Sequence, residues 1–377
     1  MRGTLQAFDL GEPGPANLAD IEAGLSAMWR SVAKTSGTES AVMRAAALTL
    51  LVYVDREEAA REVNNLLADV TRQNPCRTIV MVMDPAATPP GLMASVSAHC
   101  HLPVEGEMQI CSEQITLHAR GQTGPELMSL VLPLTVSGLP IHLWWRMANF
   151  DIPAYFDQVL RVTQRLIVDS ARFSAAGPDL RALAAWVKTH SDRVRVSDLN
   201  WARMTPWREV VAQCFDPPDC RRYLADICQV RIEYEKQSVR LSTQRAETLL
   251  LTAWLATRLG WEFQRAESRG ENLPHVLYFR TKHGEVEVER VPKEIEGGGS
   301  GVCFSLAIEA DGAHFSFSRG PDGKAVQSRA QVPGLAPLTR TVRIEAGDEV
   351  EILNNELMLS GRDQVYEEVL ALLAQMS

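Results

Sequence analysis

The chain has 377 residues, of which 46% are hydrophobic and 23% charged, a composition typical of a globular protein long enough for two or three domains. Its formal net charge of −9 and its lack of any basic block argue against nucleic acid or an anionic membrane as the main partner. The longest apolar runs fall far short of the ~20 residues that span a bilayer, and residues 1–15 lack the apolar core of a signal peptide. We therefore expect a cytoplasmic protein.

Seven cysteines are scattered along the chain without a close C-x-x-C pair. An odd, sparse set with no secretory signal predicts free thiols in a reducing compartment. His99, Cys100 and His101 are neighbours on an extended stretch, where adjacent side chains point to opposite sides, so no metal site is expected. The cysteines are Cys76, Cys100, Cys111, Cys214, Cys220, Cys228 and Cys303.

Residues 1–40 predict a helical N-terminal extension. Apolar side chains recur at helical spacing over residues 18–34, and a second helix is expected to begin near Glu39.

Residues 41–219 predict a doubly wound α/β domain with a mostly parallel sheet. A strand at 49–53, a helix through Gln73 and a strand at 77–83 form a βαβ unit, for which a right-handed crossover is expected. Residues 84–103 contain several prolines and are expected to form a loose connection. The alternation continues with strands at 107–120, 141–146 and 165–169, a helical or irregular segment at 126–135, and helices at 151–159, 178–190 and 206–215.

Residues 220–377 predict a separate α+β domain. A strand at 231–234 and a helix at 243–259 are followed by segments in which apolar and polar side chains alternate, as in an antiparallel meander with one covered face. A terminal helix over residues 363–375 is expected to cover the apolar face. The glycine-rich run 297–301 is expected to be a hairpin loop, because it joins two strands and precedes no helix.

Motifs of catalysis are missing from the sequence. It contains no G-x-x-x-x-G-K loop, no G-x-G-x-x-G after a strand, no G-x-S-x-G elbow and no H-E-x-x-H helix. Isolated histidines such as His142, on an apolar strand, are more typical of satisfied core residues than of general bases. We therefore expect no catalytic residue, no cofactor and no metal.

Two tryptophans and two arginines are concentrated around one turn of chain, in the segment 197–216. Trp201, Arg203, Trp207 and Arg208 allow two interpretations. The tryptophans could fill a seam between two domains, with the arginines paired to carboxylates, or the four side chains could anchor a partner protein, as Trp and Arg often do. Both hold if a partner docks at the seam. Arg146, at the end of a strand, is a further candidate for the docking surface.

The run DLNWARMTPWRE, residues 198–209, resembles the signature of the OpcA family, the glucose-6-phosphate dehydrogenase assembly proteins. Other stretches match in the same order. They are NPCRTIVMV at 74–82, EQITLHARG at 113–121 and LPLTVSGLPIHLWWR at 132–146. The resemblance extends from about residue 15 to the end and is densest up to residue 216.

This resemblance implies a non-catalytic partner that binds glucose-6-phosphate dehydrogenase, favours its active oligomer and raises its activity, which supports NADPH production in the oxidative pentose phosphate pathway. Two alternatives stay open from the residues alone. One is an α/β enzyme that binds a sugar phosphate at the carboxyl ends of its strands, and the other is a ligand-sensing regulatory module.

Overall fold

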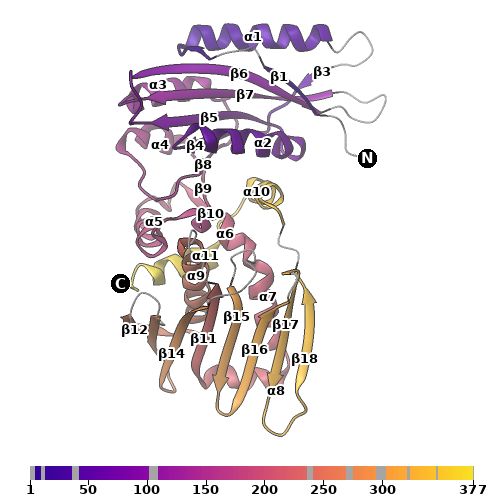
Figure 1. Ribbon diagram of the computed structural model, residues 1–377, viewed down its shortest axis with the longest axis vertical. Coiled ribbons are helices and arrows are strands. Elements are labelled where there is room, and N and C mark those ends of the chain that lie inside the picture. Colours follow the sequence, from indigo (N-terminus) through magenta and orange to yellow (C-terminus); the bar gives the residue numbers. More distant parts are fainter. Residues whose placement is uncertain are drawn as a thin grey trace.

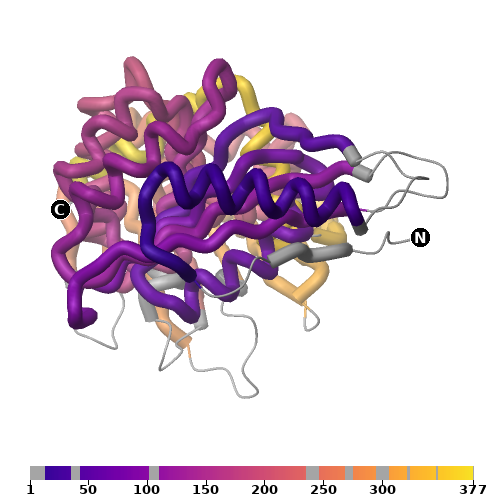
Figure 2. Tube along the Cα trace, turned by 90° about the horizontal axis from the view of Figure 1, so that it is seen from above, coloured from indigo at the N-terminus to yellow at the C-terminus, as the bar shows by residue number. Residues whose placement is uncertain are grey.

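The computed structural model describes residues 5–9, 13–35, 42–101, 109–235, 241–268, 275–293, 303–320, 323–344 and 347–376. Two β-sheets lie at opposite ends of the long axis of the molecule, and a layer of helices lies between them (Figure 1). Seen from above, helix α1 (Leu18–Thr35) lies across the outer side of the first sheet (Figure 2). The short helices that follow the last strand of the first sheet, residues 199–225, therefore begin in the layer between the two sheets (Figure 1).

The first sheet, sheet A, has ten strands and is mostly parallel. Its parallel part has the order β7-β5-β4-β8-β9-β10, so the chain winds outward from β4 in one direction and from β8 in the other. The strands are β1 (Leu5–Asp9), β2 (Gly14–Pro15), β3 (Val42–Arg44), β4 (Leu48–Val54), β5 (Cys76–Asp84), β6 (Gly91–His101), β7 (Gln109–Arg120), β8 (Ile141–Trp145), β9 (Arg165–Val168) and β10 (Arg195–Asp198). The predicted doubly wound α/β architecture is confirmed.

Three local predictions are wrong. The stretch 84–103 contains β6, which pairs antiparallel with β7, because no proline of this stretch lies within residues 91–101. Residues 42–44 form β3 in place of the helix expected from Glu39, while residues 36–41 lie outside the described part. Cys100 and Cys111 oppose each other in the β6–β7 ladder and form a disulfide, so they are not free thiols.

Four cysteines within the described residues are free, namely Cys76, Cys214, Cys220 and Cys228. The side chain of Cys303 and the glycine-rich run 297–301 lie outside the described residues.

Helices cover both faces of sheet A. Helix α2 (Glu57–Gln73) packs on one face of β4 and β5, whereas the crossovers after β7, β8 and β9 pack on the other face. These crossovers leave the first face of β8 and β9 bare. Helix α10 (Glu349–Met358), which comes from the far end of the chain, covers it. The crossover helices are α3 (Gly124–Leu134), η1 (Ala154–Phe156), α4 (Asp157–Val162), η2 (Ser170–Arg172) and α5 (Ala176–His190).

The second sheet, sheet B, has eight strands in the order β12-β13-β14-β11-β15-β16-β17-β18. Its pairs are antiparallel except β11 with β14. The predicted antiparallel second part is therefore confirmed. The strands are β11 (Ile227–Glu235), β12 (Glu262–Ser268), β13 (His275–Arg280), β14 (Glu285–Lys293), β15 (Cys303–Ala310), β16 (Ala313–Arg319), β17 (Ala325–Gln331) and β18 (Leu338–Arg343).

The helices between the two sheets come from three parts of the chain. Helix α7 (Thr205–Cys214) contacts β17, and α9 (Leu241–Leu259) contacts β11 and β15. The terminal helix α11 (Gln364–Leu373) packs mainly on α9 and α5, so it lies between the sheets and not directly on sheet B as expected. The short helices α6 (Leu199–Arg203), α8 (Pro218–Arg221) and η3 (Arg222–Ala225) complete the layer.

One hydrophobic cluster runs without a break from sheet A through this helical layer to sheet B. No helix in the described ranges combines the length and the apolar composition needed to cross a membrane.

Helix α10 offers a test of how the C-terminal segment contributes to stability. Leu353 is 0% exposed in the cluster between α10, α2 and sheet A, whereas Met358, at the end of the same helix, is 72% exposed. We expect Leu353→Ala to lower the free energy of unfolding by about 2–5 kcal/mol and Met358→Ala by less than about 0.5 kcal/mol. Urea unfolding measures both, and equal losses would contradict the packing described for α10.

Candidate functional site

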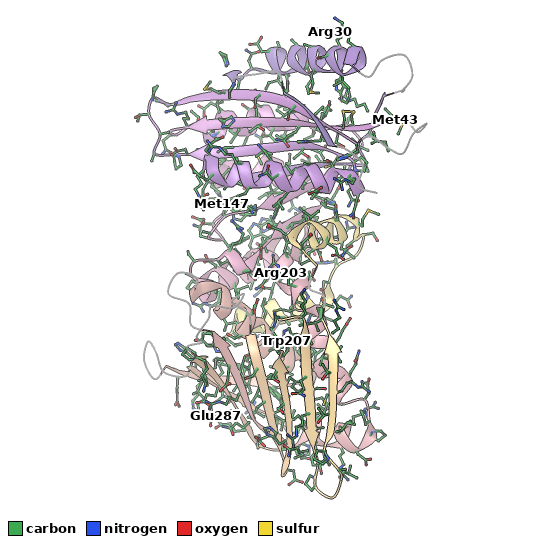
Figure 3. All side chains as sticks on the ribbon, turned by 45° about the vertical axis from the view of Figure 1, so that its right-hand side comes forward. Arg30, Met43, Met147, Arg203, Trp207 and Glu287 are labelled. Carbon is green, nitrogen blue, oxygen red and sulfur yellow. A yellow bond between two sulfur atoms is a disulfide. The ribbon has the colours of Figure 1, made fainter. Side chains whose placement is uncertain are left out.

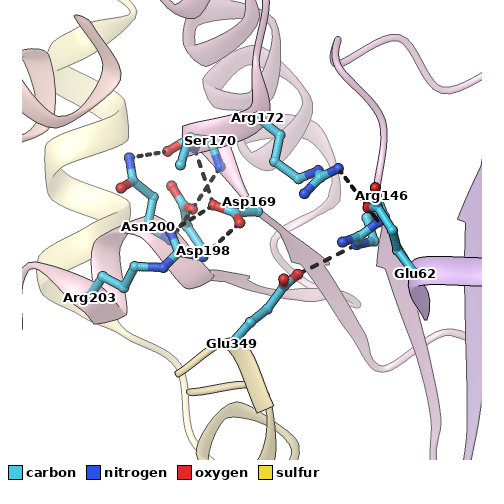
Figure 4. A network of polar contacts seen from close by, with 10 residues as sticks. Glu62, Arg146, Asp169, Ser170, Arg172, Asp198, Asn200, Arg203 and Glu349 are labelled. Atoms are coloured by element: carbon cyan, nitrogen blue, oxygen red, sulfur yellow. Dashed lines mark hydrogen bonds and ion pairs between the residues drawn. The ribbon is translucent and has the colours of Figure 1, made fainter. Parts of the chain in front are cut away.

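Polar residues follow β8, β9 and β10 at the carboxyl edge of sheet A. In doubly wound sheets, ligands bind at this edge where the strand order reverses, which here is between β4 and β8. Arg146 comes directly after β8, Asp169 comes directly after β9, and Asp198 ends β10 (Figure 4). These three residues mark the natural place to look for a site.

Arg146 fills the crevice next to the reversal. Its side chain is 2% exposed, its Nη1 donates to Glu62 Oε2 at 3.1 Å, and its Nε lies 3.4 Å from Glu349 Oε1. Arg172 approaches the same Glu62 carboxylate at 3.7 Å. The hydrogen bond from Arg146 holds the pKa of Glu62 below its usual value. The ion pairs of Arg146 with Glu62 on α2 and with Glu349 on α10 therefore occupy this position and join the two helices (Figure 4).

The turn from β4 into α2 does not form a phosphate cradle. Dinucleotide sites of this topology use a glycine-rich turn and the positive end of the following helix to hold the pyrophosphate. Here Glu57 and Glu58 occupy the first turn of α2 and would repel a phosphate. Among the described residues, no group of three or more His, Cys, Asp or Glu side chains could hold a metal ion.

Asp198 is a buried carboxylate that ties the C-terminal helix to sheet A. It is 1% exposed and accepts hydrogen bonds from the backbone N–H of Ser170 and Asn200, each at 2.9 Å. The Tyr366 hydroxyl of α11 donates to its other oxygen at 2.9 Å. Burial and the nearby charge of Asp169 raise the pKa of Asp198 to about 6, although the hydrogen bonds oppose this shift.

Asp169 and Arg203 form a bidentate ion pair at the carboxyl end of β9. The two guanidinium nitrogens of Arg203 donate to Asp169 Oδ1 and Oδ2 at 3.0 and 2.7 Å. Burial alone would lower the pKa of Arg203, but the carboxylate of Asp169 outweighs burial and raises it above the usual value. The side chain of Arg203 stays 26% exposed, so this pair reaches the surface.

Trp201 is held between Arg208 and α11. The Arg208 guanidinium carbon lies 3.3 Å from the centre of the Trp201 ring, and Arg208 Nη2 donates to Thr205 Oγ1 at 2.8 Å. Trp201 Nε1 donates to Asp363 Oδ2 at 2.7 Å, while Asp363 Oδ1 caps α11 by accepting from the Tyr366 N–H at 2.9 Å. Burial lowers the pKa of Arg208 to about 10. Trp201 thereby fixes the start of the terminal helix.

Trp207 lies on the sheet B side of the same segment. It is 3% exposed, and its ring centre is 5.9 Å from the Arg319 guanidinium of β16. Its Nε1 has no hydrogen-bond partner within the described part of the chain. Phe215, at the end of α7, packs on Phe315 with ring centres 4.6 Å apart. Figure 3 shows Arg203 in the helical layer and Trp207 closer to sheet B, within the region between the two sheets that we call the junction.

A short loop, defined here as residues 358–363 from the last residue of α10 to the cap of α11, is held against this junction. Arg165 Nη2 donates to the carbonyl oxygens of Leu359 and Gly361 at 2.7 and 2.9 Å, and Arg165 Nη1 donates to Ser197 Oγ at 2.6 Å. The loop borders a pocket of about 420 Å³ that Trp201 also lines. Met358 is 72% and Leu359 is 50% exposed, so the loop presents apolar side chains at the surface.

The structure thus brings together only part of the predicted residue set. Trp201, Arg203 and Arg208 form one cluster on α6 and α7, Trp207 faces sheet B, and Arg146 lies apart at the end of β8. Both tryptophans are 3% exposed, and Arg203 pairs with Asp169, as the seam interpretation expects, whereas Arg208 donates to Thr205 Oγ1 and the Trp201 carbonyl oxygen and not to a carboxylate.

Several residues of this junction were not identified from the sequence. The acidic residue directly after an apolar strand was an available signal for Asp169. Arg165, Glu349, Asp363 and Tyr366 gave no local signal, because their partners are far away in the sequence.

The raised pKa of Asp198 predicts a pH-dependent stability. Between about pH 4 and pH 6 the folded chain keeps a proton on Asp198 that an unfolded chain has released, so this contribution falls as the pH rises through about 6. We expect the wild type to lose on the order of 2 kcal/mol more than Asp198→Asn between pH 4.5 and pH 7. Urea unfolding at several pH values measures this difference, and parallel pH profiles for the two proteins would contradict it.

Comparison with known proteins gives matches along most of the chain. Residues 68–185 match the family model described as the glucose-6-phosphate dehydrogenase subunit N-terminal domain, and residues 194–370 match the corresponding C-terminal domain. Proteins named OxPP cycle protein OpcA are 28% identical over 322 residues in Synechocystis sp. and 30% identical over 225 residues in Nostoc punctiforme. These alignments cover 82% and 59% of this chain but 65% and 46% of those relatives.

Distant likenesses to solved structures also exist. An oxidoreductase from Parabacteroides merdae has a TM-score of 0.47 and 10% identity, with 89% of this chain and 98% of that chain covered. The oxidoreductase yvaA of Bacillus subtilis has a TM-score of 0.46 and 10% identity, with 88% and 96% covered.

The matches to both domain models and to the cyanobacterial relatives establish the family: this chain belongs to the OpcA family of glucose-6-phosphate dehydrogenase assembly proteins.

Proposed function

We propose that this chain is a cytoplasmic, non-catalytic activator that binds glucose-6-phosphate dehydrogenase and favours its active oligomer, thereby supporting NADPH production in the oxidative pentose phosphate pathway. The observation that carries the proposal is the match to both dehydrogenase-subunit domain models, over residues 68–185 and 194–370. A chain that shares both domains of such a subunit has the parts needed to act on the same enzyme.

The polar edge of sheet A supports a role other than catalysis. Arg146 closes the crevice at the strand reversal through Glu62 and Glu349, and Glu57 and Glu58 replace a phosphate-binding turn. A dinucleotide or sugar phosphate would have to displace Glu62 and Glu349 from the buried guanidinium of Arg146.

The junction supports a role in docking. Trp201 and Trp207 are too buried to reach a partner, so we assign them the task of positioning α7, α11 and the loop 358–363. Arg203 and Arg208 reach the surface beside them. Met358 and Leu359 supply exposed apolar area, which partner interfaces bury at their centre. Arg146 contributes indirectly, because its ion pair with Glu349 holds α10, the helix that ends at Met358.

Activation follows if the chain binds the active oligomer of the dehydrogenase more tightly than its inactive forms. A 100-fold preference corresponds to about 2.7 kcal/mol, which is within the usual range of allosteric coupling.

The experiment is a NADP-reduction assay of the host's purified glucose-6-phosphate dehydrogenase with increasing amounts of this chain. We expect the wild type to raise activity to a plateau. We expect Met358→Asp with Leu359→Asp to need at least ~10-fold more protein for half-maximal activation, because two charges in a buried apolar contact cost several kcal/mol.

Val162→Asp is the matched control, since Val162 is also an exposed apolar residue, 41% exposed, but lies on α4 away from the loop. It should activate like the wild type. A wild-type chain that leaves the dehydrogenase unchanged would refute the proposed function. Equal activation by the loop variant would refute only the assignment of the loop.

A further inference from the structure

The free edge of sheet B has the features of a docking site for an extended peptide. We propose that strand β18 receives an acidic, extended segment of the partner dehydrogenase, which adds a further strand to the sheet. The identity of the partner rests on the proposed function, whereas the chemistry of the segment follows from β18 itself.

The backbone of β18 offers unpaired hydrogen-bonding groups. Within the described residues β18 pairs only with β17, and Figure 1 shows no element beyond it. The Ile344 N–H donates to the Lys324 carbonyl oxygen at 2.8 Å, so Ile344 faces β17. Because backbone groups alternate in an antiparallel strand, three residues of β18 direct their N–H and C=O groups outward. They are Thr339, Thr341 and Arg343.

The side chains along this edge include exposed apolar residues as well as charged ones. On β17, Val326 and Ala330 are buried where the helical layer covers the sheet. Leu338 on β18, the partner of Ala330, is 51% exposed, and Leu335 just before the strand is 50% exposed, whereas Val342, the partner of Val326, is half-buried. The hydrophobic cluster therefore leaves the Leu338 end of β18 uncovered, and an added strand would find apolar surface there beside its own backbone contacts.

Charge selects an acidic occupant. Between residues 313 and 344 the sequence has five basic side chains and one acidic one, although the whole chain carries a net charge of −9. Arg329 on β17 and Arg340 on β18 are exposed, and neither guanidinium has an ion-pair or hydrogen-bond partner in the described part of the chain. A negatively charged segment would pair with them. A second copy of β18 would instead bring arginines together, which is destabilising.

The test measures binding of the purified dehydrogenase to the full chain and to two variants. Thr341→Pro removes an outward N–H and blocks strand addition without removing a bond to β17. Arg329→Glu with Arg340→Glu reverses the charge and leaves the backbone free. We expect each to raise the Kd for the dehydrogenase at least ~10-fold, and we expect wild-type affinity to fall with added salt.

Arg161→Glu with Arg193→Glu is the control, because both arginines are exposed but lie on the α4–α5 side of the molecule. It should keep the wild-type Kd within about twofold. Thermal unfolding of each variant separates lost folding from lost binding. If Thr341→Pro fails to fold, the charge-reversal pair still decides the outcome.

Hydrogen exchange provides a direct reading of strand addition. We expect the peptide containing the outward amides of residues 339, 341 and 343 to exchange more slowly in the complex than in the free chain. Wild-type binding with unchanged exchange at β18 and unchanged affinity of both variants would overturn this inference and leave the proposed function standing. A wild-type chain that does not bind the dehydrogenase would overturn both.

Discussion

The junction of this molecule depends on a buried carboxylate. Asp198 lies at the end of the last parallel strand, where burial without partners would cost several kcal/mol. Two backbone N–H groups and the Tyr366 hydroxyl donate hydrogen bonds to Asp198. Because Tyr366 lies on α11, its hydrogen bond ties this helix to the end of β10 in sheet A. Asp363 then caps that helix and accepts from Trp201, which fixes the segment leading to α7 and sheet B.

This network gives a physical reason for the concentration of tryptophan and arginine in residues 198–209. Two of these side chains join elements that are distant in sequence: Trp201 joins α6 to α11, and Arg203 joins α6 to the end of β9. Arg208 stacks on Trp201 from the neighbouring helix α7. The ion pairs of Arg146 do the same between sheet A and α10. These contacts hold the ends of the strands in sheet A, α10 and α11 in fixed positions relative to one another.

Much of the fold could be predicted because it rests on local patterns. The β4–α2–β5 unit and the alternating strands of sheet B follow from periodicity alone. Strand β6 was missed because its prolines dominate the stretch before it, and the Cys100–Cys111 disulfide could not be foreseen because it depends on the register of that strand. The tryptophan–arginine segment was found, but its partners Asp363 and Tyr366 were not, because a contact between residues about 160 positions apart leaves no local trace.

We propose that the Trp201–Asp363 contact keeps the loop 358–363 in the form that the dehydrogenase recognises. Trp201→Phe removes the indole N–H that donates to Asp363 and leaves a smaller aromatic ring beside Arg208. Titrating this variant into the dehydrogenase assay tests the claim most directly. We expect a higher concentration of this variant for half-maximal activation with an unchanged plateau, because binding weakens while the bound state is the same. Half-maximal activation at the wild-type concentration, in a variant shown to have lost the contact, would contradict it.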